Sequence, residues 1–204
     1  SGLETISIAT AKIRAGMGHI YVAGGAESMS SIPMTGYKFA PNYNITSNTP
    51  DYVAGMGHTA EAVAKKWGIT REAQDEFSVR SHQRAAAAID AGKFEAEILP
   101  IDVEEVYVED NVKKTRSWTV SVDEGVRRET TMEALGRLKP AFMNNGTVTA
   151  GNSSQTSDGA AFVLVVSEEM VKKFNLKPIA RMVSCAVAGV EPIYMGIGPC
   201  KAVP

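Results

Sequence analysis

The sequence switches between two kinds of pattern, and this switch limits the folds that the chain can adopt. Residues 1–17 carry apolar side chains at helical spacing and lead directly into a short apolar strand at residues 19–26. Helix-like and strand-like segments alternate again from Gly146 onwards. Between these parts, residues 30–143 read as a long and mostly helical insertion. The pattern predicts an α/β fold with a parallel sheet, because helix–strand succession is typical of βαβ units.

The inserted segment has helix boundaries that can be read from its capping residues. Helices are predicted at residues 59–67 and, after the N-cap Thr70, at residues 71–91, where Gly92 ends the helix. A short third helix is predicted at residues 130–138. These helices carry most of the regular structure expected in the insertion.

Extended chain is predicted at residues 98–108, 147–150, 160–166 and 179–190. The third of these segments is a continuous apolar run, as expected of a strand buried on both faces. Ser167 then caps a helix predicted at residues 168–174. Residues 28–51 are rich in Ser, Pro, Asn and Gly and are predicted to form a loop.

Composition argues against several classes of protein. The 204 residues have a formal net charge of −2, whereas a domain that reads phosphate backbones is usually basic, so no nucleic-acid partner is expected. No apolar run is long enough to span a bilayer, and the first residues do not form a secretory signal. The two cysteines, Cys185 and Cys200, fit a reducing compartment, so a cytoplasmic location is expected.

Several polar or glycine-rich segments are candidates for a ligand site, although each also has a purely structural interpretation. Arg127 and Arg128 suit phosphate binding, but a solvated charged face is the ordinary interpretation of such a run. The long polar run at residues 151–159 joins two predicted strands, where functional loops of α/β folds lie. Cys200 has no His nearby in the sequence and is read as a bystander. The three histidines lack metal-ligand spacing, so no metal site is expected.

Seven segments, taken together and in order, resemble the thiolase family. They are Ser1-Gly2-Leu3, Gly24-Gly25-Ala26-Glu27-Ser28-Met29-Ser30, Met56-Gly57-His58-Thr59-Ala60-Glu61, Leu138-Lys139-Pro140-Ala141-Phe142, Gly146-Thr147-Val148-Thr149-Ala150-Gly151-Asn152-Ser153-Ser154, Ser157-Asp158-Gly159-Ala160-Ala161 and Met195-Gly196-Ile197-Gly198-Pro199. Each segment alone is a weak signal, but seven in the family's order over essentially the whole chain are highly specific. On these residues the chain is identified as a member of the thiolase family.

The resemblance implies a partial thiolase fold. Thiolases have two βαβαβαββ halves stacked in αβαβα layers, with a loop domain inserted in the first half. Matching the chain to this plan assigns residues 1–29 to the later part of the N-terminal half and residues 30–143 to the mostly helical, CoA-binding loop domain. Residues 144–176 would complete the N-terminal half, and residues 177–204 would begin the C-terminal half.

The resemblance also implies acyl transfer between CoA thioesters, in which a 3-ketoacyl-CoA and CoA give acyl-CoA and acetyl-CoA. The family's nucleophile lies in a Cys-x-Ser-Gly-Leu run, so the cysteine is expected two residues before Ser1. The family's other catalytic motifs, Asn-Glu-Ala-Phe, Gly-His-Pro and Cys-x-Gly, do not occur in the sequence. We therefore expect no catalytic residue among these 204, and no turnover by this chain alone.

What the chain would retain is a CoA-binding surface, with CoA as substrate and no separate cofactor. The residues implied at the nucleotide end are Arg127, Leu135, Leu138 and Phe142, with Arg127 packing on the adenine or its phosphates. The residues implied along the pantetheine channel are Met56, Ala150, Ser154 and Met195, with Ser154 hydrogen-bonding the pantetheine amide.

The subtype is suggested by the short stretch between Met29 and Met56. Biosynthetic, tetrameric members usually carry a longer loop there, so the resemblance favours the degradative 3-ketoacyl-CoA type of fatty-acid β-oxidation. A biosynthetic acetyl-CoA acetyltransferase stays an alternative, as does a non-catalytic CoA-binding module. For the parent protein, a homodimer or a dimer of dimers is implied by the same likeness.

Overall fold

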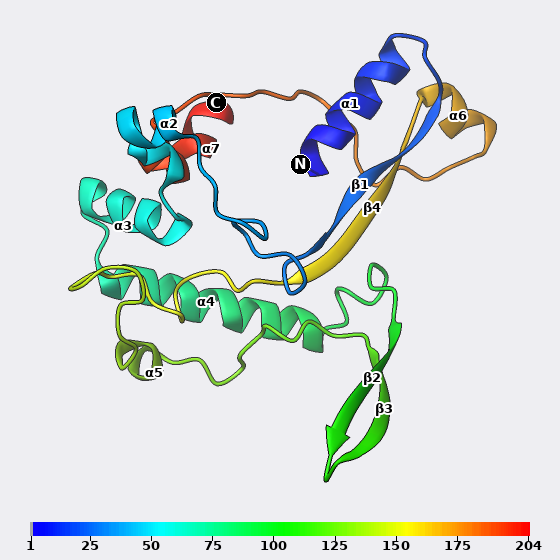
Figure 1. Cartoon of the computed structure of the whole chain (residues 1–204). Coiled ribbons are helices and arrows are strands. Elements are labelled where there is room, and N and C mark those ends of the chain that lie inside the picture. Colours follow the sequence, from blue (N-terminus) through cyan, green and yellow to red (C-terminus); the bar gives the residue numbers. More distant parts are fainter. Residues whose placement is uncertain (1) are drawn as a thin grey trace. The chain divides into compact units, whose positions relative to one another are not determined.

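Helix α1 (Gly2–Arg14) and strand β1 (Ile20–Ser28) open the chain in the computed structural model, which describes residues 2–204. The first residue of the helix predicted at residues 1–17, Ser1, lies outside the described residues. Gly16 has a φ of 70°, which glycine adopts without strain, and it ends the helix. The first predicted helix and strand are thus confirmed, and α1 packs on β1 (Figure 1).

Strand β1 pairs with β4 (Asp158–Val166), and the two run antiparallel. The register aligns Ile20 with Val166 and Ser28 with Asp158. The parallel sheet predicted from the helix–strand succession is therefore wrong for this pair. The succession constrains only strands joined by a crossover helix, whereas a long insertion separates β1 from β4 and lets the second strand return alongside the first.

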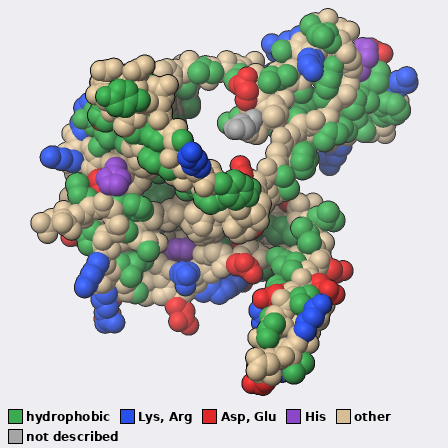
Figure 2. Space-filling model, viewed as in Figure 1, with side chains coloured by type: hydrophobic (Ala, Val, Ile, Leu, Met, Phe, Trp, Pro, Cys, Tyr) green, Lys and Arg blue, Asp and Glu red, His purple; other side chains and the backbone are tan. Residues whose placement is uncertain are grey.

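The prediction that residues 160–166 form a strand is confirmed, but the prediction that both faces are buried is wrong. Phe162 and Leu164 are 61% and 58% exposed, although α1 contacts the strand pair. Figure 2 shows hydrophobic side chains gathered over the part of the chain that holds α1, β1 and β4. An apolar run indicates which side chains require cover, but the described residues do not supply a layer for both faces.

The end of the β1–β4 pair is closed by a carboxylate. The backbone N–H of Ser30 donates to Oδ1 of Asp158 at 2.9 Å, and the Ser30 hydroxyl donates to Oδ2. These hydrogen bonds, from the hydroxyl first and then the backbone, hold the pKa of Asp158 below its usual range. At the other end, Ser167 caps α6 (Glu168–Lys173) as predicted, with the Met170 N–H donating to its hydroxyl at 3.4 Å.

Residues 28–51, predicted as loop, contain one short helix and the start of a second. They are α2 (Tyr43–Asn48) and the 3-10 helix η1 (Pro50–Val53). Asn42 caps α2, because its Oδ1 accepts the N–H groups of Asn44 and Ile45 at 3.0 and 3.2 Å. Near the end of the chain lie a second 3-10 helix, η2 (Pro192–Ile197), and α7 (Gly198–Ala202).

The strand predicted at residues 179–190 is absent from the described structure. This segment forms no helix or strand, and Ile179 and Val187 are 99% and 89% exposed. A strand requires a neighbouring strand to pair its backbone N–H and C=O groups, and the described residues offer none to this segment. The apolar composition alone could not reveal whether such a partner is present.

The inserted part contains α3 (Met56–Trp67), α4 (Arg71–Asp90) and α5 (Met132–Gly136). All three predicted helices are confirmed, with α3 starting three residues earlier than predicted and α5 shorter. Thr70 caps α4 as predicted, accepting the Ala73 N–H at 3.2 Å, and Thr131 caps α5 in the same way at 3.1 Å. Gly92 follows α4 with a φ of 65°.

A hairpin of β2 (Ile101–Glu109) and β3 (Val112–Val120) lies between α4 and α5 in the chain. Extended chain was predicted at residues 98–108, but β3 was missed because its run of charged residues hides any apolar alternation. Asp110 and Asn111 turn the chain with φ values of 55° and 60°, as a two-residue hairpin turn requires. Figure 2 shows acidic and basic side chains side by side along this hairpin.

The chain forms two compact units. One consists of the residues up to Gly55 together with Thr156–Pro204, and the other of Met56–Gln155. Among the residues that the structure describes, none of the helices combines the length and apolarity that a membrane crossing requires.

Candidate functional site

A buried carboxylate on α3 holds the segment that follows Gly146. Glu61 is 4% exposed, and its Oε1 accepts the backbone N–H groups of Thr147 and Val148, each at 2.8 Å. Its Oε2 accepts the Thr147 hydroxyl at 3.1 Å. The strand predicted at residues 147–150 is therefore wrong, because these N–H groups bond to a side chain from a distant helix and not to a neighbouring strand.

The charge on Glu61 is stabilised by the groups that it binds. Burial acts to raise the pKa of this carboxyl, but the N–H groups of Val148 and Thr147, the Thr147 hydroxyl and the nearby His58 together hold the pKa below its usual range. Glu61 is therefore an anion at neutral pH that acts only as an acceptor. Such charge-assisted hydrogen bonds are stronger than neutral ones, so the segment is firmly attached to α3.

A second buried carboxylate, on α4, holds the turn that comes next. Asp75 is 2% exposed; Arg71 Nε donates to its Oδ2 at 2.7 Å, and Asn152 Nδ2 donates to its Oδ1 at 2.9 Å. The other end of the Asn152 amide, Oδ1, accepts the Thr149 N–H at 2.7 Å. Thr149 is completely buried, and its hydroxyl accepts the Gly151 N–H at 3.2 Å. Hydrogen bonds to Asn152 and to the Thr149 hydroxyl thus fix the backbone on both sides of Ala150.

The same arginine reaches the end of α5. Arg71 Nη2 donates to the backbone oxygens of Leu135 and Leu138 at 2.6 and 3.1 Å. The Leu135 oxygen also accepts the Leu138 N–H at 2.9 Å, so the guanidinium adds a bond from α4 to a helix end that the backbone already closes. One side chain therefore connects α4 to both the α5 terminus and, through Asp75, the turn at Asn152.

Two glycines permit close packing next to the predicted CoA residues. A Cβ on Gly57 would overlap the ring of Phe142. A Cβ on Gly151 would lie 2.5 Å from side-chain carbons of both Leu135 and Leu138. These three apolar residues of the predicted nucleotide end therefore rest on backbone next to Met56 and Ala150, two residues of the predicted pantetheine channel.

The segment that carries Arg127 is held by the second half of α4. The Arg127 N–H donates to His82 Nδ1 at 3.2 Å, and Arg128 Nη1 forms a 2.8 Å ion pair with Asp90. The hydrogen bond from Arg128 keeps the pKa of Asp90 below its usual range. The Arg127 side chain is exposed. The Arg127 N–H and the Arg128 side chain thus attach the loop to α4, while the Arg127 guanidinium stays on the surface.

The structure places seven of the eight predicted CoA residues in the unit Met56–Gln155, and Met195 in the other unit. Met56 is half-exposed at the start of α3, and Ala150 and Ser154 are exposed on the polar turn. Ser154 donates locally to the Gln155 backbone oxygen at 3.2 Å. Their roles in binding CoA stay predictions.

Sequence reasoning missed the residues that hold this surface together. Glu61 belongs to a segment recognised from the resemblance, but nothing in its neighbours indicates a buried anion. Arg71 and Asp75 are spaced as an ordinary surface pair one helical turn apart. The i,i+4 spacing in the sequence indicates that Arg71 and Asp75 form a pair. It does not indicate that the pair is buried, because burial depends on the contact with Asn152, far along the chain.

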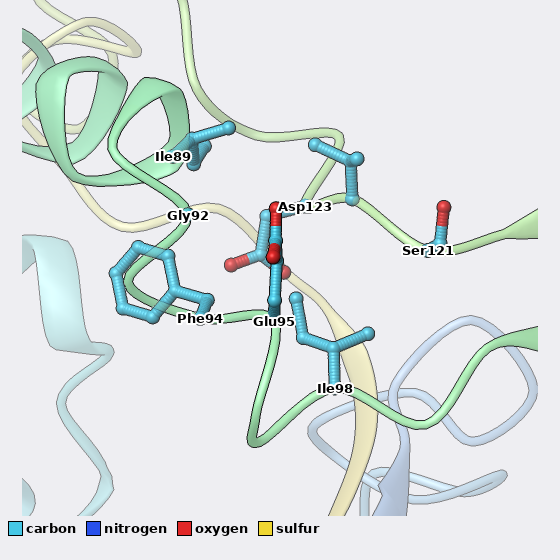
Figure 3. A pocket seen from close by; sticks show the side chains of 8 residues that line it. Ile89, Gly92, Phe94, Glu95, Ile98, Ser121 and Asp123 are labelled. Atoms are coloured by element: carbon cyan, nitrogen blue, oxygen red, sulfur yellow. The ribbon is translucent and has the colours of Figure 1, made fainter.

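A small pocket lies in the same unit but away from these residues. It has a volume of about 110 Å³ and lies where the chain leaves α4 and where it leaves β3 (Figure 3). Its lining residues are Ile89, Gly92, Phe94, Glu95, Ile98, Ser121, Val122 and Asp123. None of the eight predicted CoA residues lines it, so the pocket is not the candidate site.

Comparison with known proteins identifies the family to which this chain belongs. Residues 1–169 match the family described as Thiolase, N-terminal domain, and the chain therefore belongs to the thiolase family. It is 50% identical over 205 residues to the 3-ketoacyl-CoA thiolase of Bacillus subtilis (strain 168), covering 100% of this chain and 52% of that protein.

Solved structures show the same fold. The dimeric peroxisomal thiolase of Saccharomyces cerevisiae superposes with a TM-score of 0.86 at 36% identity, covering 100% of this chain and 50% of that one. Human mitochondrial 3-ketoacyl-CoA thiolase in complex with CoA superposes with a TM-score of 0.81 at 37% identity, covering 100% and 51%. The fold is thus a partial thiolase fold, and the chain spans about half the length of the relatives that it matches.

Proposed function

We propose that this chain supplies the CoA-binding part of a thiolase that transfers acyl groups between CoA thioesters. In this reaction a 3-ketoacyl-CoA and CoA give acyl-CoA and acetyl-CoA. The observation that carries the proposal is the hydrogen-bonded framework of Glu61, Asp75 and Asn152. It holds an exposed polar turn beside apolar residues that rest on glycines, an arrangement suited to a long, amphipathic ligand.

The nucleotide end of CoA is assigned to the Arg127 side. An exposed guanidinium can bind phosphate oxygens and stack on a purine, and the His82 contact fixes the backbone that carries it. Leu138 and Phe142, which are 37% and 39% exposed, provide the apolar surface of this end, whereas Leu135 is buried and supports it from within. The pantetheine arm is assigned to Met56, Ala150, Ser154 and Met195, with the Ser154 hydroxyl as the hydrogen-bonding group. A human relative solved with CoA supports this ligand class.

Catalysis itself is assigned to groups outside these 204 residues. The sequence lacks the Asn-Glu-Ala-Phe, Gly-His-Pro and Cys-x-Gly motifs, and Cys185 and Cys200 are exposed and lie in none of the family's motifs. The chain by itself should therefore leave acetoacetyl-CoA unchanged in the presence of CoA. Thiolysis by purified residues 1–204 would contradict this assignment.

The parent enzyme is proposed to be of the degradative, 3-ketoacyl-CoA type, acting in fatty-acid β-oxidation in the cytoplasm as a homodimer. The Bacillus subtilis relative is a 3-ketoacyl-CoA thiolase, which supports the substrate class, and the yeast relative is dimeric, which supports the dimer. Activity on long-chain 3-ketoacyl-CoA should exceed activity on acetoacetyl-CoA. The reverse preference would favour the biosynthetic acetyltransferase.

Calorimetric titration of CoA into the protein expressed from its complete gene tests the binding assignment. Arg127→Ala should weaken CoA binding about tenfold, because a charge-assisted contact to phosphate is lost. Arg116→Ala is the matched control, since it removes an exposed arginine from the β2–β3 hairpin. Equal effects of the two changes, or no CoA binding by the unmodified protein, would contradict the proposal.

A further inference from the structure

We infer that Arg71, Asp75 and Asn152 form a positioning relay that sets the spacing between the two ends of the CoA site. The inference rests on the proposed function, because it concerns the same site. It assigns a role to three residues that need not touch the ligand. They act on CoA through the backbone segments that they hold.

The relay is continuous from one end of the site to the other. It begins at the Leu135 and Leu138 carbonyls, which accept Arg71 Nη2 at 2.6 and 3.1 Å. It continues through Arg71 Nε to Asp75 at 2.7 Å, and from Asp75 to Asn152 Nδ2 at 2.9 Å. It ends at the turn, where Asn152 Oδ1 accepts the Thr149 N–H at 2.7 Å.

Each member of the relay is required in its chemical form. Asp75 uses both oxygens as acceptors and is 2% exposed, so water cannot replace a lost partner. The Asn152 amide donates from Nδ2 to Asp75 and also to the Thr147 oxygen at 3.1 Å, while Oδ1 accepts. Turning this amide over would place donor against donor and acceptor against acceptor. Arg71 bonds one carboxylate and two carbonyl oxygens through its fork, which a lysine cannot reproduce.

The spacing matters because CoA is one molecule with two binding ends. Its nucleotide end is assigned to the segment that includes Leu135 and Leu138, and its pantetheine arm to the turn that includes Ala150 and Ser154. Covalent linkage lets one end raise the effective concentration of the other only where the two subsites lie at a matching separation. A relay that fixes this separation strengthens binding of intact CoA more than binding of either half alone.

Calorimetry with three ligands on the protein expressed from its complete gene tests the relay. The ligands are CoA, adenosine 3′,5′-bisphosphate and pantetheine. In Asp75→Asn, the new side chain has one oxygen and one NH₂ group. Because Arg71 and Asn152 both donate to position 75, the NH₂ group must face one of these donors, so the relay is broken. The Kd for CoA should rise about tenfold, while the Kd for each half changes by less than about twofold. In turnover assays the KM for CoA should rise with little change in kcat.

The control is Glu109→Gln, the same kind of change at an exposed carboxylate that pairs with Lys114 on the hairpin. It should leave all three Kd values unchanged. Should Asp75→Asn fail to fold, Arg71→Lys is read with the same ligands and the same expectation. Combining Asp75→Asn with Asn152→Asp restores one donor and one acceptor between the two positions and should recover part of the CoA affinity.

The outcomes separate the two ideas. Unmodified protein that binds CoA, with folded variants that bind CoA equally well, overturns the relay and leaves the proposed function standing. Equal weakening of CoA and of both halves also overturns it, because that result means damage to the subsites themselves. Unmodified protein that binds none of the three ligands overturns the proposed function and the relay together.

Discussion

Glu61 on α3 accepts the backbone N–H of Val148 at 2.8 Å. A carboxylate near the start of the unit Met56–Gln155 thus holds a peptide bond near the end of that unit in the sequence. The bond is buried, and the same side chain also accepts the N–H and hydroxyl of Thr147. Glu61 thus anchors Thr147 and Val148, which lead into the turn that Asp75 and Asn152 hold. Its removal is therefore the first test of the structure.

Glu61→Gln should lower the free energy of unfolding by about 1–3 kcal/mol, because an amide NH₂ group would then face backbone N–H donors in a buried site. Urea denaturation followed by far-ultraviolet circular dichroism measures this change. Glu133→Gln is the matched control, since Glu133 pairs with Arg137 on the exposed surface of α5. A midpoint shift no larger in Glu61→Gln than in Glu133→Gln would disprove the anchoring role.

The same carboxylate should make stability depend on pH. The pKa of Glu61 is lowered in the folded protein, so the native state binds fewer protons than the unfolded state as pH falls below the ordinary glutamate value of about 4.3. Its contribution is complete above that value and is lost as pH falls through the lower native pKa. Unfolding free energies between pH 7 and acid should therefore decline more steeply in the unmodified protein than in Glu61→Gln. Parallel curves would contradict the assignment.

The β2–β3 turn offers a change that should stabilise the protein. Asn111 has a φ of 60°, a left-handed conformation that glycine adopts at no steric cost. Asn111→Gly should raise the stability of the hairpin by about 0.5–1 kcal/mol, whereas Asn111→Ala should lower it by a similar amount. The midpoint of thermal unfolding should rise in Asn111→Gly and fall in Asn111→Ala. A shift of both midpoints in the same direction would contradict the left-handed backbone conformation of residue 111.

Local signals predicted helices better than they predicted sheets or the framework of the site. Thr70 and Ser167 were recognised as caps because a cap acts within a few residues, and both make the expected hydrogen bonds. The partner of β1 and the partner of Glu61 lie far along the chain, and nothing next to either indicates them. Long-range contacts decide strand direction and carboxylate burial, so periodicity could reach neither.

The predicted CoA residues show the same difference between what local sequence indicates and what long-range contacts decide. Resemblance indicated Phe142, Leu135 and Leu138 as residues of the nucleotide end, but it did not reveal what supports them. The structure shows that each rests on a glycine, Gly57 or Gly151. The resemblance could thus indicate which residues to assign to a binding surface, and these assignments stay predictions, whereas the glycine packing beneath them required the folded chain.

Alanine at these two glycines should have graded effects on that packing. At Gly57 the new Cβ would overlap the inner atoms of the Phe142 ring, which can move only if the whole side chain is displaced, so Gly57→Ala should cost about 1–3 kcal/mol. At Gly151 it would meet the flexible ends of Leu135 and Leu138, so a smaller loss is expected. Gly136→Ala, with open space around its Cβ, is the control and should be neutral or stabilising by up to about 1 kcal/mol. Chemical denaturation and CoA titration measure the losses of stability and of affinity. Both losses should be largest in Gly57→Ala, smaller in Gly151→Ala and smallest in Gly136→Ala. Equal losses in Gly57→Ala and Gly136→Ala would mean that Phe142 does not rest on α3.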